Sequence, residues 1–258
     1  MMCAACLCVA GASREHEGSD MSGPTVVLVH GAGAGAWAWE LLGPELDELG
    51  VAHVEIDLPS SGSEPAADAG VVGDAAAVRD LLDSVTGPVV LVGNSYGGVV
   101  ISAAAVDHPA VARLVYVAAF MPEAGIPIMN QLAATDEFMA ALTFTEDGRG
   151  GLDADAVAGI VFQQADAETA RAAIARLRPA RLSDMDIALP AVAWTAIPST
   201  YVVCTEDRSI PPSYQRQCAT ERATVKIEAP FDHSPGGSHP SELAAILAAI
   251  TAEVTVAP

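Results

Sequence analysis

A single serine lies in a stretch of small residues where its hydroxyl could act as a nucleophile. The stretch Gly93-Asn94-Ser95-Tyr96-Gly97 stands between an apolar run and a segment rich in valine and alanine. Glycines on both sides allow the close packing that a sharp turn from a strand into a helix requires. Such a turn exposes the hydroxyl and aims the first N–H groups of the helix at a developing oxyanion. Glycine-rich turns are also ordinary connections, so both interpretations stand at this point.

A nucleophilic serine needs a general base, which here would be a histidine that follows it in the chain. His233 and His239 both lie in "FDHSPGGSHPSEL". His233 comes soon after the last expected strand, on a loop rich in glycine and serine, and we expect it to be the base. His239 stands beside Pro240, where a helix begins, and is expected to cap that helix. His108 is expected to cap the end of the helix that begins at the serine.

The base in turn needs a carboxylate that orients it, placed after the strand that precedes the histidine loop. That strand is expected in "STYVVC", and Glu206 and Asp207 follow it. Residues beyond a strand end point alternately to opposite sides, so one of the two should reach the imidazole, and we expect Asp207. Asp232 competes because it is adjacent to His233, but the side chains of neighbouring residues diverge.

Two backbone N–H donors should stabilise the tetrahedral intermediate. One is expected from Tyr96, the residue after the nucleophile. The other is expected from Ala32 in "HGAGAGAWAW", the loop after the first strand, whose glycines let the backbone approach closely. This run also resembles a nucleotide-binding loop, but it lacks the Gly-x-Gly-x-x-Gly spacing of that motif.

Apolar runs alternate with helix-like segments along most of the chain. Strands are expected in "TVVLVH", "VAHVEID", "PVVLVG", "VARLVYVAA", "STYVVC" and "ATVKIEA". Apolar strands without alternation, separated by helices, indicate a mostly parallel sheet covered on both faces. The rhythm breaks from about 122 to 195, where a mostly helical insert with a glycine-rich interruption is expected to form a small lid. We expect an α/β domain at 23–258 after a disordered extension at 1–22.

The insert holds residues that could contribute to a pocket. Its large apolar side chains could line the pocket or pack as the core of the lid, and they are Phe138, Met139, Phe144, Phe162 and, near its end, Trp194. Asp184 and Asp186 lie in the same segment and are expected to be surface charges. The few aromatic residues favour a small or aliphatic acyl group.

The charge balance argues against several partners. The chain has 33 acidic and 12 basic residues, a formal net charge of −21, and no cluster of Lys and Arg. Nucleic acid and anionic membrane surfaces need such clusters, so we expect neither as a partner. A small uncharged substrate is the natural expectation. No His/Cys pair complements the N-terminal cysteines, so neither a metal nor a cofactor is expected.

The N-terminus and the cysteines bear on the compartment. Three of the five cysteines are Cys3, Cys6 and Cys8, and the odd count argues against a disulfide framework. The opening segment lacks a basic residue before its apolar run, which makes a poor secretory signal, and Met21 is an alternative start. No apolar stretch approaches the length of a membrane span. We expect a soluble, cytoplasmic protein, with export as the alternative.

At these residues the chain resembles the α/β-hydrolases, and more narrowly the branch of plant salicylate-binding methylesterases and hydroxynitrile lyases with its bacterial relatives. The resemblance spans about 25 to 250 and is carried by "VLVHGAGAGAWAWELL", "DLPSSG", "LVGNSYGG", "IPSTYVVCTEDRSIPP" and "DHSPGGSHPSEL". It implies the α/β-hydrolase fold with a small helical lid. It also implies Ser95, Asp207 and His233 as the catalytic triad and Ala32 and Tyr96 as the oxyanion donors.

The activity implied is a serine hydrolase that cleaves small carboxylic esters or lactones through an acyl-enzyme. Lyases of this branch carry a lysine after the catalytic histidine and a threonine where Gly31 stands. This chain has Ser234 and Gly31, so cyanohydrin cleavage is not expected. The alternatives are C–C bond hydrolysis or a lyase step on the same triad, and a non-catalytic small-ligand-binding member of the fold.

Overall fold

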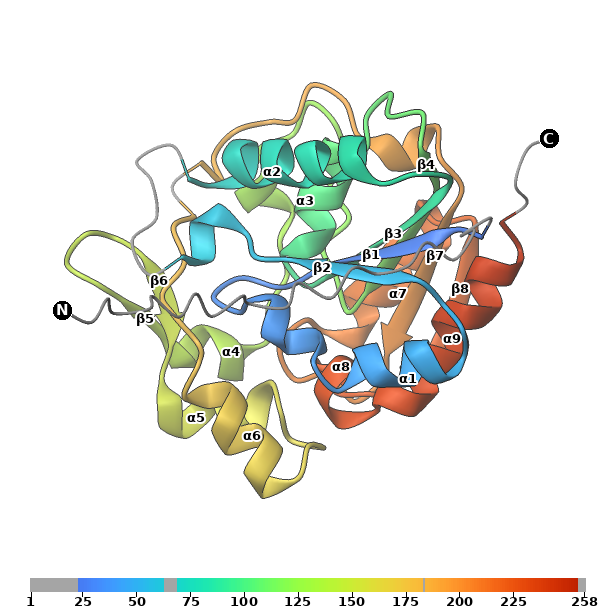
Figure 1. Cartoon of the computed structure of the whole chain (residues 1–258). Helices are drawn as coiled ribbons and strands as arrows, with labels where there is room; N and C mark the ends of the chain where they lie inside the picture. The colour runs from blue at the N-terminus through green and yellow to red at the C-terminus, as the bar shows by residue number, and fades with distance from the viewer. Residues whose placement is uncertain (1–22, 63–68, 183, 255–258) are drawn as a thin grey trace, which may run out of the picture.

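The structure, a computed structural model, describes residues 23–62, 69–182 and 184–254. One sheet is formed by β1 (Thr25–Val29), β2 (His53–Ile56), β3 (Val89–Asn94), β4 (Val111–Val117), β7 (Ser199–Cys204) and β8 (Val225–Ala229). Its strand order is β2-β1-β3-β4-β7-β8, and every neighbouring pair is parallel (Figure 1). The parallel sheet expected from the apolar runs is therefore confirmed.

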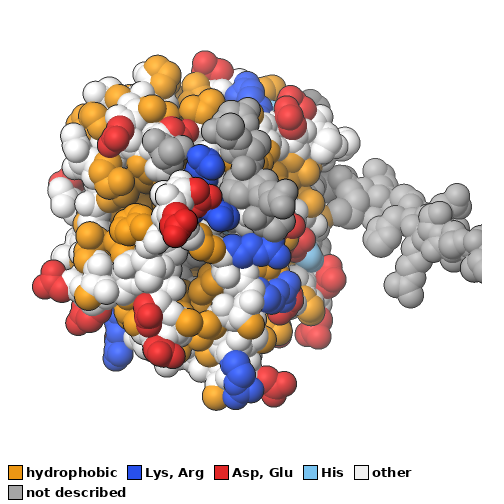
Figure 2. Space-filling view, turned by 90° about the vertical axis from the view of Figure 1, so that its left-hand side faces the viewer, with side chains coloured by type: hydrophobic (Ala, Val, Ile, Leu, Met, Phe, Trp, Pro, Cys, Tyr) orange, Lys and Arg blue, Asp and Glu red, His pale blue; other side chains and the backbone are white. Residues whose placement is uncertain are grey.

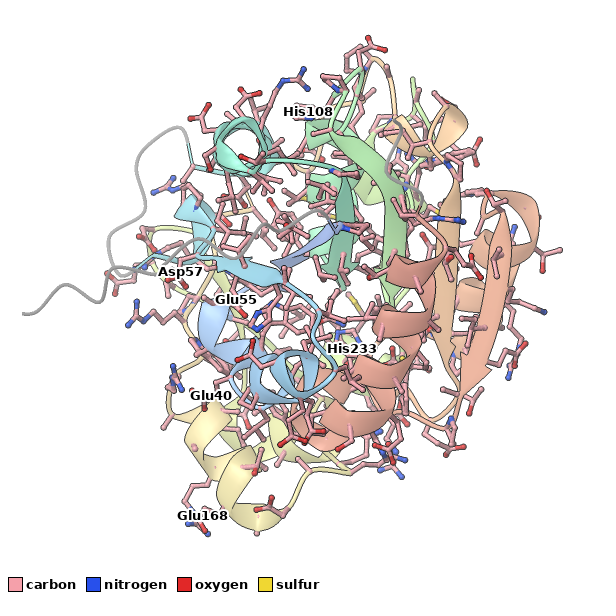
Figure 3. The ribbon with its side chains drawn as sticks, turned by 45° about the vertical axis from the view of Figure 1, so that its right-hand side comes forward. Glu40, Glu55, Asp57, His108, Glu168 and His233 are labelled. Carbon is pink, nitrogen blue, oxygen red and sulfur yellow. The ribbon has the colours of Figure 1, made fainter. Side chains whose placement is uncertain are left out.

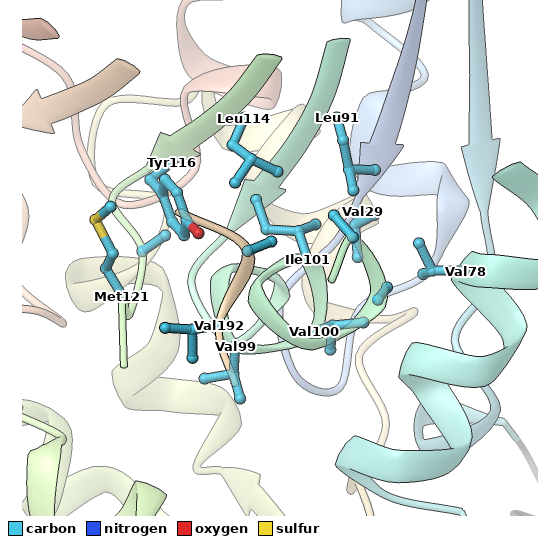
Figure 4. Packing of buried hydrophobic residues seen from close by; sticks show 14 of the residues in the cluster. Val29, Val78, Leu91, Val99, Val100, Ile101, Leu114, Tyr116, Met121 and Val192 are labelled. Atoms are coloured by element: carbon cyan, nitrogen blue, oxygen red, sulfur yellow. The ribbon is translucent and has the colours of Figure 1, made fainter. Parts of the chain in front are cut away.

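The inner strands of the sheet show no alternation because both of their faces are buried, whereas the edge strands β2 (HVEI) and β8 (VKIEA) alternate. Successive side chains of a strand point to opposite faces. Along β3, Val89 and Leu91 belong to one hydrophobic core, which Figure 4 shows in part, whereas Val90 and Val92 belong to the other. The inner strands β1, β3, β4 and β7 each contribute to both cores, whereas the edge strands β2 and β8 contribute to one core each.

Helices cover the two faces of the sheet. The first core includes side chains of α2 (Val71–Ser84), α3 (Gly97–Ala104) and α7 (Pro212–Glu221). The second includes side chains of α1 (Leu42–Glu48) and α9 (Pro240–Ala252). Figure 1 shows α2 and α3 side by side on one side of the sheet and α1 and α9 on the other.

Short helical segments complete the connections between these elements. They are the 3-10 helices η1 (Ala36–Trp39), η2 (Pro59–Ser61), η3 (Ile128–Gln131) and η4 (Ala193–Thr195) and the short helix α8 (Pro235–Ser238). Two of them, η1 and η2, follow β1 and β2 in the chain. Both therefore lie at the carboxyl edge of the sheet, where sites of parallel α/β folds are built.

Residues 122–195, which we call the insert, connect β4 to β7. They contain α4 (Asp136–Ala141), α5 (Ala154–Ile160), α6 (Ala167–Ile174) and an antiparallel pair, β5 (Leu142–Phe144) and β6 (Gly150–Leu152). The glycine-rich interruption expected in the sequence is the turn of this hairpin. The helices of the insert pack around a small core of their own, away from the central sheet (Figure 1).

The large apolar residues of the insert divide between core and surface. Phe162 is buried in the core of the insert, and Phe138 packs against it. Met139 and Phe144 are 57% and 72% exposed. Figure 2 shows the face that lies to the left in Figure 1, where hydrophobic side chains are interspersed with charged ones. Trp194 donates a hydrogen bond from its Nε1 to the carbonyl of Pro122, 2.7 Å away, which joins the two ends of the insert.

Some predictions from the sequence concern residues outside the described part. The extension at 1–22, with three of the cysteines, is among them. Within the described ranges Cys204 and Cys218 are buried free thiols. No helix in those ranges combines the length and the apolar character that crossing a bilayer requires. Nor do the described residues include a group of three or more side chains suited to hold a metal ion.

Candidate active site

Ser95 occupies a strained backbone position between β3 and α3. Its φ is 54°, a left-handed conformation that costs a residue other than glycine about 1–2 kcal/mol. Four hydrogen bonds hold it there: its N–H donates to the carbonyls of Val117 (3.3 Å) and Ala118 (3.2 Å), and its carbonyl accepts from Gly98 (3.1 Å) and Phe120 (3.1 Å). This is the sharp turn that the sequence predicted for the serine.

The glycines beside the serine are required by close contacts between backbones. A Cβ added at Gly93 would lie 2.6 Å from the carbonyl oxygen of Gly97, and one added at Gly98 would lie 2.2 Å from that of Phe120. Real Cβ atoms do not approach other atoms this closely, so the strand and the helix can pack at this separation only with glycine at these positions. The pattern around Ser95 is therefore explained by geometry.

The loop after β1 lies directly against the serine. A Cβ added at Gly31 would be 3.0 Å from the Cβ and 3.5 Å from the Oγ of Ser95. Ala32 follows Gly31 in this loop, and Tyr96 follows Ser95 at the start of α3. Within the described part of the chain, neither the N–H of Ala32 nor that of Tyr96 donates to another backbone carbonyl. The two expected oxyanion donors therefore have no backbone acceptor there, and their role stays a prediction.

Asp207 and His233 meet in the interior at the same edge of the sheet. Nδ1 of His233 is 2.9 Å from Oδ2 of Asp207, and both residues are buried. The same Oδ2 accepts from Nε2 of Gln215 (2.8 Å), and Oδ1 accepts from the backbone N–H groups of Ser209 (2.7 Å) and Ile210 (3.1 Å). Four donors fix this carboxylate, so it can hold the proton of the imidazole on Nδ1 and leave Nε2 as the basic nitrogen.

Opposing effects set the basicity of His233. Burial lowers the pKa of the imidazole, but the charge of Asp207, its hydrogen bond and the charge of Asp232 act against burial, and the net effect raises the pKa above its ordinary value of 6.5. A carboxylate that stabilises the imidazolium is what a general base needs when it takes a proton from an alcohol.

The competing acids have other contacts. Glu206 is exposed and forms no side-chain bond to the imidazole. Asp232 is buried, but its Oδ1 accepts from the N–H of Ser234 (3.1 Å) and from Oγ of Ser238 (2.6 Å), and its Oδ2 accepts from the N–H of Gln164 (3.0 Å). Asp232 therefore shapes the histidine loop and does not orient the ring.

The other two candidate histidines have contacts of their own. His239 stands at the N-cap position of α9, but its side chain does not cap the helix, so that part of the expectation is wrong. Its Nε2 instead pairs with Oε1 of Gln164 at 3.0 Å. His108 pairs with Asp83 at 3.1 Å, and Figure 3 shows it at the top of the molecule, well separated from His233.

Asn94 is a residue of the site that the sequence reasoning missed. Its Nδ2 donates to the carbonyls of Val117 (3.0 Å) and His233 (3.1 Å), so it ties the histidine loop to the turn that carries Ser95. The sequence offered one indication of this role: Asn94 stands beside Ser95 in the polar tripeptide Asn94-Ser95-Tyr96, between an apolar run and a segment of small residues. In the described residues no hydrogen bond joins Oγ of Ser95 to the imidazole, so the triad stays a prediction at that contact.

The insert is attached to the loops that carry the acid and the histidine. Nε2 of Gln163 donates to the carbonyl of Glu206 (2.6 Å), next to Asp207. The N–H of Gln164 bonds the carboxylate next to His233 at 3.0 Å, and its side chain donates to the carbonyl of Pro230 at 3.1 Å. The turn between α5 and α6 is thus held over the edge of the sheet where the candidate site lies.

A parallel sheet with a serine on a strained turn between strand and helix defines a class of α/β enzymes. The family model described as the alpha/beta hydrolase family matches residues 26–246. The chain belongs to this family.

Relatives of known sequence or structure agree with this assignment. The chain is 31% identical over 212 residues to the alpha/beta hydrolase nvfD of Aspergillus novofumigatus, covering 77% of this chain and 84% of the relative. It is 29% identical over 245 residues to putative methylesterase 14 of Arabidopsis thaliana, covering 86% and 70%. A pyrethroid hydrolase from Sphingobium faniae has the same fold, with a TM-score of 0.78, 22% identity and coverage of 89% and 98%.

Proposed function

We propose that the protein is a serine hydrolase that cleaves small carboxylic esters or lactones through an acyl-enzyme. Ser95 is the nucleophile, His233 the general base and Asp207 the residue that orients the imidazole. The N–H groups of Ala32 and Tyr96 form the oxyanion hole. The relatives named as methylesterases or esterases support the ester class.

The first half of the reaction transfers the acyl group to the enzyme. Oγ of Ser95 attacks the carbonyl carbon while Nε2 of His233 takes its proton, and the carbonyl oxygen becomes an oxyanion that the N–H groups of Ala32 and Tyr96 bind. The intermediate collapses when the bond from the carbonyl carbon to the alcohol oxygen breaks. The imidazolium then gives its proton to the departing alkoxide, which leaves as the alcohol.

The second half returns the enzyme to its starting state. Water replaces the alcohol, His233 takes a proton from it, and the hydroxide oxygen attacks the acyl carbon of the ester on Ser95. When the bond to Oγ breaks, the serine oxygen recovers its proton and the carboxylic acid leaves. In a lactone both products are one molecule, a hydroxy acid.

The observation that carries the proposal is the contact of Nδ1 of His233 with Oδ2 of Asp207 at 2.9 Å, at the sheet edge where Ser95 sits at a positive φ. Only Nε2 of that ring remains to face a nucleophile. We propose further that residues 23–258 form one domain, that the insert acts as its lid and that the substrate is a small molecule. A cytoplasmic location stays a prediction.

Labelling and turnover together test the proposal. The wild type should react with a fluorophosphonate probe and hydrolyse p-nitrophenyl acetate, and Ser95→Ala should do neither. Ser84→Ala is a matched control, because Ser84 is an exposed serine of α2 whose hydroxyl donates a hydrogen bond to the carbonyl of Leu81. A wild type that is not labelled, or labelling that survives in Ser95→Ala, contradicts the proposal. Saturable binding of a lactone without turnover would support the non-catalytic alternative.

A further inference from the structure

Asp74 of α2 is a fully buried carboxylate with no part in the reaction above. Its Oδ1 accepts from the backbone N–H of Ser60 (2.9 Å), and its Oδ2 accepts from Oγ of Ser60 (2.6 Å) and from the phenol of Tyr96 (2.8 Å). Burial raises the pKa of this carboxyl, and the hydrogen bonds from Ser60 and Tyr96 oppose that effect. Burying a carboxylate is costly without such donors, so this one is held by a set of matched partners.

The hydrogen-bond partners of Asp74 belong or connect to the two segments that form the proposed oxyanion hole. Tyr96 supplies one N–H of the hole, and its phenol ends on the carboxylate. On the other side, Oγ of Ser61, next to Ser60, accepts from the N–H of Gly33 at 3.1 Å. Gly33 follows Ala32, whose N–H is the second donor. One buried carboxylate therefore connects the two separate segments that carry the two N–H groups.

A second link joins the loop after β1 to the residues around η2, which include Ser60 and Ser61. His30 is buried between two backbone groups: its Nδ1 is 2.7 Å from the carbonyl of Gly31, and its Nε2 accepts from the N–H of Leu58 at 3.0 Å. Burial lowers the pKa of this imidazole, which keeps it neutral with its proton on Nδ1. The residues around η2 are thus fixed to the loop after β1 at two points.

We propose that Asp74 is a positioning residue of the oxyanion hole, which sets the direction of the Tyr96 N–H through the phenol of that residue and the place of the Ala32 loop through Ser60 and Ser61. This inference rests on the proposed function. An oxyanion donor must lie 2.7–3.1 Å from the oxygen that it binds, and the peptide before Tyr96 belongs to the strained Ser95. Figure 1 shows α2, which carries Asp74, beside α3, whose start carries the donor.

The first arm of the test observes the donor itself. Selective labelling with 15N-tyrosine gives four backbone amide signals, because the chain has four tyrosines. The signal lost in Tyr96→Phe is that of Tyr96. Asp74→Asn should move this signal and leave the other three in place. Asp83→Asn is the matched control: it makes the same substitution near the other end of α2, where Asp83 bonds His108, and should move none of them.

The second arm measures what the positioning does. Asp74→Asn and Tyr96→Phe should each lower kcat/KM on p-nitrophenyl acetate on the order of 10- to 100-fold. The loss should fall on kcat with KM unchanged, and a trifluoromethyl ketone should bind more weakly by the same factor. The double variant should lose no more than the worse single variant, because both substitutions break the same connection.

The outcomes separate this inference from the function on which it rests. A Tyr96 signal that does not move in Asp74→Asn overturns the inference, as does a loss of melting temperature with kcat/KM and ketone affinity within twofold of Asp83→Asn. A wild type that neither reacts with the fluorophosphonate nor hydrolyses the ester overturns the proposed function, and the amide signal then still reports whether Asp74 fixes the Tyr96 N–H.

Discussion

Asp207→Asn changes one oxygen of a carboxylate that four donors surround. The amide of asparagine offers one acceptor oxygen in place of two. If that oxygen serves the N–H groups of Ser209 and Ile210, the amide nitrogen faces Gln215 and His233. The imidazole can relieve this contact only by moving its proton from Nδ1 to Nε2, and in that tautomer it cannot accept the proton of Ser95.

The expected losses follow from these contacts. In a Ser-His-Asp triad, replacing the aspartate by asparagine stabilises the wrong imidazole tautomer and lowers kcat about 10⁴-fold. This factor corresponds to about 5.4 kcal/mol of transition-state stabilisation. One donor of Gln215 is left without an acceptor, at a cost of about 1–3 kcal/mol of stability. For a chain of this size each kcal/mol lowers the melting temperature by about 2–4 °C. The variant should therefore remain folded while its activity nearly disappears.

The substitution also has an expected effect on the pH profile. His233 must be neutral to act, so kcat/KM falls as pH drops through its pKa, which in the wild type lies above 6.5. Removing the charge and hydrogen bond of Asp207 leaves burial, the largest effect, which lowers the pKa of His233 and is then opposed only by the charge of Asp232, so the acid limb should move to lower pH. The free energy of unfolding should also depend on pH, because the pKa of His233 is higher in the folded state than its ordinary value of 6.5. Protonation of His233 therefore stabilises the fold below pH 6.5. This stabilisation is lost as the pH rises through the pKa of the folded state.

Stopped-flow hydrolysis of p-nitrophenyl acetate from pH 5 to 9, with circular dichroism melting curves, measures both effects. Asp232→Asn is the matched control, because Asp232 is also buried next to the imidazole but bonds other groups. It should lose stability and keep kcat within about tenfold of the wild type. The reasoning is refuted if Asp207→Asn keeps more than a tenth of kcat, or if the two variants lose activity equally.

Three further substitutions, two of them with a matched control, test other parts of the structure. Gly98→Ala places a Cβ 2.2 Å from a backbone oxygen and should cost about 1–3 kcal/mol in urea unfolding, whereas Gly159→Ala, with nothing within 4 Å, should be neutral or stabilising. Asn94→Ala releases the histidine loop and should lower kcat/KM about 10- to 100-fold with little change of melting temperature. Asp184→Ala exposes two N–H groups of α2 and should cost about 1 kcal/mol by thermal melting, while Asp186→Ala should cost nothing measurable.

The backbone of the site was predictable from the sequence because few residues can form it. The glycines around Ser95 permit contacts that any Cβ would block, and apolar strands without alternation require helices on both faces. The order of serine, acid and histidine then placed Asp207 and His233, whose contact at 2.9 Å the structure shows. These features depend on local composition and on chain order, which a sequence displays.

What the sequence did not reveal depends on contacts between distant residues. Asp184 was expected to be a surface charge, but its carboxylate accepts from the N–H groups of Val71 and Val72, which lie more than a hundred positions earlier in the chain. The roles of Asn94 and Asp74 likewise follow from partners on other elements. The sequence does not show whether a polar residue in a helix or a turn forms its hydrogen bonds with water or with a buried group.

The attachment of the insert at Gln163 and Gln164 bears on how this scaffold can be redesigned. A graft that replaces the segment between β4 and β7 would also remove its hydrogen bonds to Glu206, Pro230 and Asp232. A transplanted segment should therefore retain both glutamines. Without these glutamines, a graft would change substrate selectivity and also disturb the positions of Asp207 and His233. A change in activity could then not be assigned to either cause.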